Sequence, residues 1–170
     1  DSLKIVEFRL YSYLSEPIIA EKIILEQSSE LELVYDIYKD MGILQGELIK
    51  DNSSRVGYSL YAKALSSNGT LICGPYVSIP PGDYVVNFSV KVTDVIDKLI
   101  MAVDIANNEG REIISRREIF GNEIMSDVWI NVSLPFTSVN YNTNYEFRII
   151  TTGFTDIYCD RVVVKRIKTF

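Results

Sequence analysis

One stretch of the chain decides the fold, and it occupies residues 73–88 as CGPYVSIPPGDYVVNF. Two consecutive prolines in its centre fix two φ angles and remove two backbone donors, so no strand continues through them. Gly82 follows and permits a positive φ, which favours a tight turn. After this turn, apolar side chains occupy every second position from Tyr84 to Val92. A period of two with one apolar face predicts a strand that covers a core on one side.

The same alternation recurs along most of the chain, with turn residues every eight to twelve positions. Many short strands in this rhythm predict an all-β fold, an antiparallel β-sandwich or barrel. The turn at Asn68-Gly69 is of the hairpin type, and helix is an open alternative only for residues 18–27. The predicted strands cover residues 3–11, 18–26, 31–38, 43–50, 56–65, 71–73, 84–92, 99–105, 112–119, 128–136, 145–149 and 157–167.

Length and composition narrow the functional class. The 170 residues suit one domain with a sizeable core, which we place at 1–170. A net charge of −6 argues against a nucleic-acid partner. The chain has no histidine, so the commonest general base and metal ligand is missing. The apolar run at 18–25 is broken by Glu21 and Lys22, so we expect no membrane insertion of this chain. Because it begins at Asp1 rather than methionine, we expect it to be part of a larger protein.

A series of short motifs between Leu44 and Ile167 carries a resemblance to a known family. The motifs are Gln45-Gly46-Glu47, Gly74-Pro75-Tyr76, Pro80-Pro81-Gly82-Asp83-Tyr84, Val103-Asp104-Ile105, Trp129 with its following strand, Glu146-Phe147-Arg148 and Asp160-Arg161-Val162. In this order they resemble a carbohydrate-binding module of the β-jelly-roll type. Such modules accompany glycoside hydrolases, membrane glycosyltransferases and cell-surface proteins. The resemblance implies a jelly-roll module over 44–167, with 1–43 as additional N-terminal strands.

The resemblance also implies a structural calcium ion. Modules of this kind hold it where the first strand meets the last, by carboxylates and carbonyl oxygens, as a hard cation requires. Glu47 and Asp160 match the motif positions, and Gln45 stands where a second carboxylate is common. The alternative is that Glu47 and Asp160 are ordinary solvated or paired acids.

A polar platform is the candidate sugar site. Sugars are bound by aromatic rings that cover their apolar faces and by polar groups that meet their hydroxyls. The strand phase places Val128 and Ile130 inward and Trp129, the only tryptophan, outward. If the outward positions of neighbouring strands share one sheet, they form a platform around this indole. Its members are Trp129, Arg148, Glu146, Asp104 and Lys91. The alternative is a solvated face of paired charges, with Trp129 covered by a loop.

Loop aromatics are a rival sugar site, and they are Tyr76, Phe120, Tyr141 and Phe154. Other residues fit a structural role. Cys73 and Cys159 are far apart in sequence, so a disulfide stays open, and two small buried side chains are the alternative. The predicted core contains Tyr84, Phe88, Val103, Ile130, Val132 and Phe147.

The sequence thus favours a binding domain over an enzyme. No compact pair of acids of the kind that jelly-roll glycosidases need lies on one strand. The resemblance implies a non-catalytic carbohydrate-binding domain whose partner is a polysaccharide or glycan. It also implies an extracellular or cell-surface location. The alternative is a structural or adhesive surface module with the same fold and no sugar site.

Overall fold

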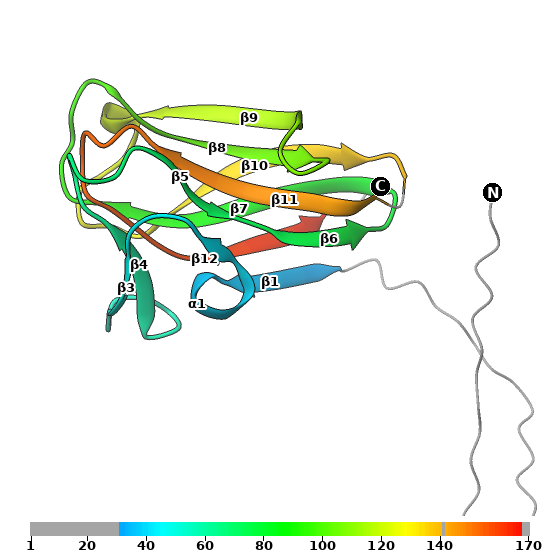
Figure 1. Ribbon diagram of the computed structural model, residues 1–170, viewed down its shortest axis with the longest axis horizontal. Helices are drawn as coiled ribbons and strands as arrows, with labels where there is room; N and C mark the ends of the chain where they lie inside the picture. The colour runs from blue at the N-terminus through cyan, green and yellow to red at the C-terminus, as the bar shows by residue number, and fades with distance from the viewer. Residues whose placement is uncertain (1–30, 141, 168–170) are drawn as a thin grey trace, which may run out of the picture.

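The computed structural model describes residues 31–140 and 142–167, which form two antiparallel β-sheets packed face to face (Figure 1). Sheet A has the strand order β10-β7-β12-β4-β3, and β1 also pairs with β12. Sheet B has the order β2-β5-β11-β8-β9, and β6 also pairs with β11. The elements are β1 (Glu32–Asp36), α1 (Ile37–Asp40), β2 (Gly42–Ile43), β3 (Glu47–Lys50), β4 (Tyr58–Ala62), β5 (Gly69–Cys73), β6 (Pro75–Ile79), β7 (Gly82–Val92), β8 (Leu99–Asn107), β9 (Glu112–Phe120), η1 (Gly121–Glu123), β10 (Ile130–Ser138), β11 (Asn142–Thr151) and β12 (Ile157–Arg166). The predicted antiparallel sandwich is confirmed.

The core lies between the sheets and follows the predicted alternation. Five predicted core residues are at most 4% exposed: Tyr84, Phe88, Val103, Val132 and Phe147. Burial of each such side chain contributes about 1.5–3 kcal/mol. Ile130 is half-buried, because it is the first residue of β10, but it packs against the same core. The inward positions of both sheets are thereby used for stability, which leaves the outer faces to carry function.

The turn at Asn68-Gly69 does not join a hairpin, and this prediction is wrong. It leads into β5, which lies in sheet B, whereas β4 before it lies in sheet A. The Asn-Gly dipeptide indicates only a backbone position with a positive φ, and Gly69 has a φ of 104°. The dipeptide does not determine which strands pair.

Several predicted strands are shorter than expected, among them the strand predicted at 56–65, which is observed only over Tyr58–Ala62. The strand predicted at 31–38 ends at Asp36, where α1 begins, and the strand predicted at 43–50 is divided into β2 and β3 by Gly46. A side chain at Gly46 would place its Cβ 2.6 Å from the Tyr61 carbonyl oxygen, at a φ of 87°. The predicted strands at 3–11 and 18–26 lie outside the described residues.

Two further expectations concern cysteines and membranes. Cys73 and Cys159 are both free thiols, and Cys159 is fully buried in the core. Within residues 31–140 and 142–167, no helix is long and apolar enough to cross a membrane.

Candidate functional site

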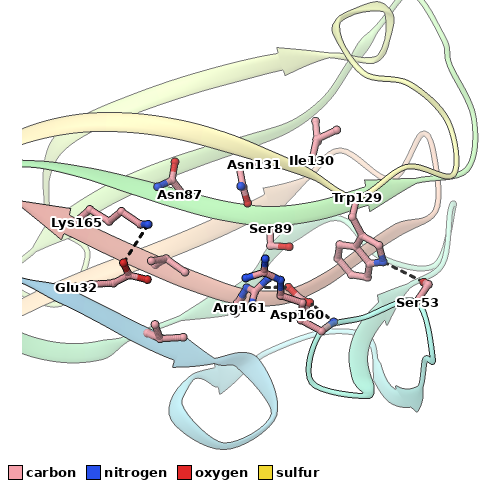
Figure 2. A pocket seen from close by; sticks show the side chains of 13 residues that line it. Glu32, Ser53, Asn87, Ser89, Trp129, Ile130, Asn131, Asp160, Arg161 and Lys165 are labelled. Atoms are coloured by element: carbon pink, nitrogen blue, oxygen red, sulfur yellow. Dashed lines mark hydrogen bonds and ion pairs between the residues drawn. The ribbon is translucent and has the colours of Figure 1, made fainter.

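An open groove of about 400 Å³ crosses the outer face of sheet A (Figure 2). Its floor comes from β10, β7, β12 and β1, and one wall comes from the loop between β3 and β4. Figure 2 shows Trp129 near one end and the pair of Glu32 and Lys165 at the other. The lining residues are Glu32, Val34, Ser53, Arg55, Asn87, Ser89, Trp129, Ile130, Asn131, Asp160, Arg161, Val163 and Lys165.

The strand register explains why polar side chains gather on this floor. Ser89 on β7 lies opposite both Asn131 on β10 and Arg161 on β12. Asn87 forms the next outward position, two residues along β7, because successive side chains alternate between faces. The inward positions between them are filled by the core, so every outward position is free to carry a polar group.

Trp129 is half-buried and held on two sides. Its indole Nε1 donates a hydrogen bond to Ser53 Oγ at 3.0 Å. Lys91 Nζ lies 5.1 Å from the centroid of the Trp129 ring and 4.3 Å from that of Tyr158, within cation–π range of both. These contacts fix the orientation of the ring at the end of the groove. Val128, predicted to point inward, is 44% exposed, because β10 begins only at Ile130.

The loop of residues 51–57 forms the groove wall and is tied down by Asp51. This carboxylate accepts hydrogen bonds from the backbone N–H of Ser53 at 2.9 Å and from Ser53 Oγ at 2.6 Å. It also pairs with Lys91 Nζ at 3.1 Å. Burial alone would raise the pKa of Asp51, but the hydrogen bonds from Ser53 and Lys91 outweigh it and lower the pKa to about 2. The same residues therefore brace both the loop and Trp129.

Asp160 ties the loop to the last strand. A register shift in β12 between Cys159 and Arg161 places this carboxylate at a β-bulge. Its Oδ2 accepts hydrogen bonds from Ser54 Oγ and from the backbone N–H of Arg55, each at 3.2 Å. Its Oδ1 is buried and has no hydrogen-bond partner in the described part of the chain.

The groove lining includes donors that the described residues do not fully pair. Arg161 Nε lies 4.0 Å from Asp160 Oδ1, too far for a hydrogen bond, although its side chain is only 17% exposed. Asn87 accepts a hydrogen bond from Ser133 Oγ on its side-chain carbonyl oxygen at 2.7 Å, so its NH₂ group is available as a donor to a ligand. Lys165 pairs with Glu32 at 3.0 Å.

The predicted platform is divided between the two sheets. Lys91 and Trp129 lie together beside the groove, but Asp104 on β8 and Glu146 and Arg148 on β11 belong to sheet B. The condition that these strands share one sheet is therefore not met. Because the two sheets pack against each other through their apolar faces, the outer faces of sheets A and B point in opposite directions. The proposed roles of the three sheet B residues in sugar binding stay predictions.

On sheet B, Asp104 is paired with two arginines. Arg148 Nε and Nη2 donate to the two oxygens of Asp104 at 2.6 and 3.0 Å, and Arg116 Nη1 adds a contact at 3.4 Å. Asp104 is fully buried, and Glu146 is 3% exposed. Burial raises the pKa of Glu146, although Arg148 opposes the shift. Sheet B thus carries a paired charge cluster, although Oε1 of Glu146 is buried without a hydrogen-bond partner among the described residues.

The three predicted calcium ligands are not brought together. Gln45 uses its amide on a turn: Nε2 donates to the carbonyl oxygens of Asn68 and Thr70, and Oε1 accepts from the backbone N–H of Asn68. Glu47 is exposed on β3, and the whole of β4 lies between it and β12, which carries Asp160. Among the described residues, no three His, Cys, Asp or Glu side chains gather closely enough to hold a metal ion. The residues present do not fit the predicted ion.

The alternation that predicts β7 and β10 also puts Asn87, Ser89 and Asn131 on outer faces, but no sequence pattern indicated Arg55 or Arg161 as lining residues. The alternation along 157–167 breaks at Asp160-Arg161, and this break was the available signal for a bulge. Three of the rival loop aromatics are exposed by 44–48%: Tyr76, Phe120 and Phe154. Tyr141 lies outside the described residues.

Comparisons with known proteins identify the fold. No family model matches the chain, and no curated protein matches its sequence. The C-terminal CBM6 of LamC, a marine laminarinase from Zobellia galactanivorans, matches with a TM-score of 0.56 at 12% identity, over 80% of this chain and 100% of that chain. The carbohydrate-binding module CBM6cm-2 of Cellvibrio mixtus lichenase 5A, solved in complex with cellotriose, matches with a TM-score of 0.53 at 10% identity, over 80% and 98%.

A third similar structure is the CBM36-1 domain of a multidomain xylanase from the hindgut metagenome of Trinervitermes trinervoides. Its TM-score is 0.51 at 12% identity, over 82% of this chain and 100% of that chain. At such low identity the likeness establishes the fold alone. The chain has the jelly-roll β-sandwich of carbohydrate-binding modules, and the predicted resemblance is confirmed at this level.

Proposed function

We propose that the chain is a non-catalytic carbohydrate-binding domain of a larger extracytoplasmic or cell-surface protein, and that the groove on sheet A binds the glycan. The observation that carries this proposal is the indole of Trp129, which lies beside a polar groove with its orientation fixed by Ser53 and Lys91. An aromatic ring covers the apolar face of a sugar, and amides and charged groups beside it meet the hydroxyls.

The groove has the size and chemistry for an oligosaccharide. Its volume of about 400 Å³ is within the range of roughly 300–1,000 Å³ that is usual for small-molecule sites. Asn87, Ser89 and Asn131 offer hydrogen-bonding groups along the floor, and a module of similar fold was solved in complex with cellotriose. These features support a binding role for the polar face of sheet A.

The acids of the groove support the absence of catalysis. A glycosidase holds two carboxylates on either side of the scissile bond, one of them ready to donate a proton. Glu32 is held by Lys165, and Asp160 is 2% exposed and accepts hydrogen bonds from the loop. Both acids thus have partners within the protein when no ligand is bound.

A structural surface module without a sugar site is the second candidate. The observation that favours it is the half burial of Trp129 together with its hydrogen bond to Ser53, since both suit a ring that packs a loop against a sheet. If the domain binds glycans through this ring, loss of the ring should weaken binding. If the ring is structural, its loss should lower stability alone.

The test is the variant Trp129→Ala, measured by affinity electrophoresis on soluble polysaccharides and by isothermal titration with oligosaccharides. Loss of a stacking aromatic at a small site should cost roughly 2 kcal/mol or more, which is tens of fold in affinity. We expect unfolding to become easier by less than about 2 kcal/mol, because the ring is only half-buried. Phe154→Ala, at an aromatic residue that is 48% exposed, is the control. Loss of binding in the Phe154 variant alone would move the site to the loops, and no binding by the wild type would favour the structural module.

A further inference from the structure

We infer that the groove on sheet A selects glycans that carry an anionic group, a uronate carboxylate or a sulfate ester. This inference rests on the proposed function and adds the class of ligand. The groove is rich in donors whose acceptors are missing from the described part of the protein. A ligand with many acceptors and a negative charge complements such a surface best.

Arg161 is the first of these donors. Its side chain is 17% exposed at the groove floor, and its nearest carboxylate oxygen, on Asp160, is 4.0 Å from Nε. A guanidinium has five N–H donors arranged to meet a carboxylate or sulfate through two parallel hydrogen bonds. Arg148 on sheet B shows what a saturated arginine looks like in this protein, since Asp104 accepts from it at 2.6 and 3.0 Å. Arg161 has no such partner among the described residues.

Arg55 and Lys165 extend the positive charge along the groove. The backbone of Arg55 is held by Asp160, but its side chain is exposed and forms no ion pair in the described residues. Lys165 stands on the same face of β12 as Arg161, about 13 Å away at 3.3 Å per residue. Its partner Glu32 is half-exposed, as Lys165 itself is, so a ligand can compete for the pair. Cations at both ends suit a polymer that bears repeated charges.

Each acid of the groove lies beside a cation of the groove, which offsets part of its repulsion of an anion. Glu32 is paired with Lys165, and Asp160 accepts two hydrogen bonds on Oδ2 while its buried Oδ1 lies 4.0 Å from Arg161 Nε. Most of the acidic residues behind the net charge of −6 lie outside the groove lining. At physiological ionic strength, charges more than about 8 Å away are largely screened, whereas the arginines would touch the ligand.

The test compares the binding of the whole chain to acidic and neutral polysaccharides of similar size. Polygalacturonate and dextran sulfate are the anionic probes, and laminarin and unsubstituted dextran are the neutral ones. We expect at least tenfold tighter binding to one anionic probe, weakening as salt rises. A preference for polygalacturonate assigns the anion as a carboxylate, and a preference for dextran sulfate assigns it as a sulfate ester.

Three variants connect the preference to the groove. Arg55→Gln and Arg161→Gln should each lower the affinity for the anionic probe about tenfold, the range of one charge-assisted contact. Asp160→Asn should raise it a few-fold, because it removes a negative charge beside Arg161. Arg111→Gln is the control, since this arginine is 73% exposed on the loop between β8 and β9.

Each other outcome overturns the inference. If neutral glycans bind as tightly as acidic ones, or if both arginine variants bind like the wild type, the anionic preference is wrong while the proposed function stands. If Asp160→Asn folds as stably as the wild type but binds the anionic probe more weakly, the charge of Asp160 does not oppose the ligand and the anionic preference is wrong. Because Arg55 is exposed, its variant decides the question even if Arg161→Gln fails to fold. If no polysaccharide binds at all, the proposed function fails together with the inference.

Discussion

The outer faces of the two sheets carry similar side chains in different states of pairing. On sheet B, Arg148 donates to both oxygens of Asp104, whereas on sheet A, Arg161 comes no closer than 4.0 Å to Asp160. Each face also buries one carboxylate oxygen without a hydrogen-bond partner among the described residues, on Glu146 and on Asp160. The two faces therefore differ in the pairing of their arginines, and this difference is one reason that we place the proposed site on sheet A.

The difference has a cause in the backbone. In sheet B, Arg148 lies directly opposite Asp104 in an uninterrupted register, and Gly110 in the loop between β8 and β9 lies against both Arg148 and Glu146. A side chain at Gly110 would place its Cβ 2.5 Å from Arg148 Nη1. In sheet A, the bulge at Asp160 interrupts the register, and the loop of residues 51–57 stands beside the floor and leaves it open.

The largest expected effect is on stability, from the variant Arg148→Leu. It would leave Asp104 buried without its main partner, and such a loss typically costs 3–5 kcal/mol. Arg161→Leu on the other face should cost less, because Arg161 Nε is 4.0 Å from Asp160 Oδ1 and Asp160 keeps its hydrogen bonds from Ser54 and Arg55. Urea denaturation of both variants measures the difference. Equal costs for the two would mean that the faces do not differ in pairing.

The second prediction concerns the stability of the protein at low pH, which depends on Asp51 in the groove wall. Its pKa of about 2 is below the ordinary value, so the ionised form stabilises the folded state. This contribution of roughly 2 kcal/mol is complete above about pH 4 and is lost as the pH falls through about 2. The free energies of unfolding of the wild type and of Asp51→Asn should therefore approach each other as the pH is lowered from 5 to 2. Asp127→Asn, at an exposed turn, is the control. A difference in unfolding free energy between the wild type and Asp51→Asn that stays constant with pH would show that ionised Asp51 does not stabilise the fold.

The sandwich could be predicted from the sequence because its signals are local. The alternation from Tyr84 to Val92 predicts which apolar side chains of this strand are buried. The candidate site is harder to predict, because it depends on which strands share a sheet. Asp104 and Lys91 have the same outward phase, yet they lie in different sheets. The position of Arg161 depends on a bulge, and the position of Trp129 depends on a loop that is 76 residues away at Ser53.

Glu146 gives a smaller and opposite effect on sheet B. Burial raises its pKa above the ordinary value, so the free energy of unfolding should fall as the pH rises from the ordinary glutamate range through the folded pKa. Glu146→Gln should remove this slope and stabilise the protein at pH 7 by about 1 kcal/mol, since an ionised oxygen without a partner is no longer buried. Glu118→Gln, at a residue 54% exposed, is the matched control. If the Glu146 variant is less stable at pH 7, the carboxylate has a partner in solution.

The smallest expected effect is that of a chelator, and it tests the unpartnered oxygen of Asp160. A calcium ion on Gln45, Glu47 and Asp160, as the sequence predicts, would be bound by the folded state only, so its removal would lower the melting temperature. Because the amide of Gln45 is engaged with the 68–70 turn and Glu47 is separated from Asp160 by β4, we expect the melting temperature to stay unchanged. Gln45→Ala should instead destabilise the protein in both conditions, through its lost hydrogen bonds. A drop that calcium reverses, and that Glu47→Ala abolishes, would show that the ion draws these residues together.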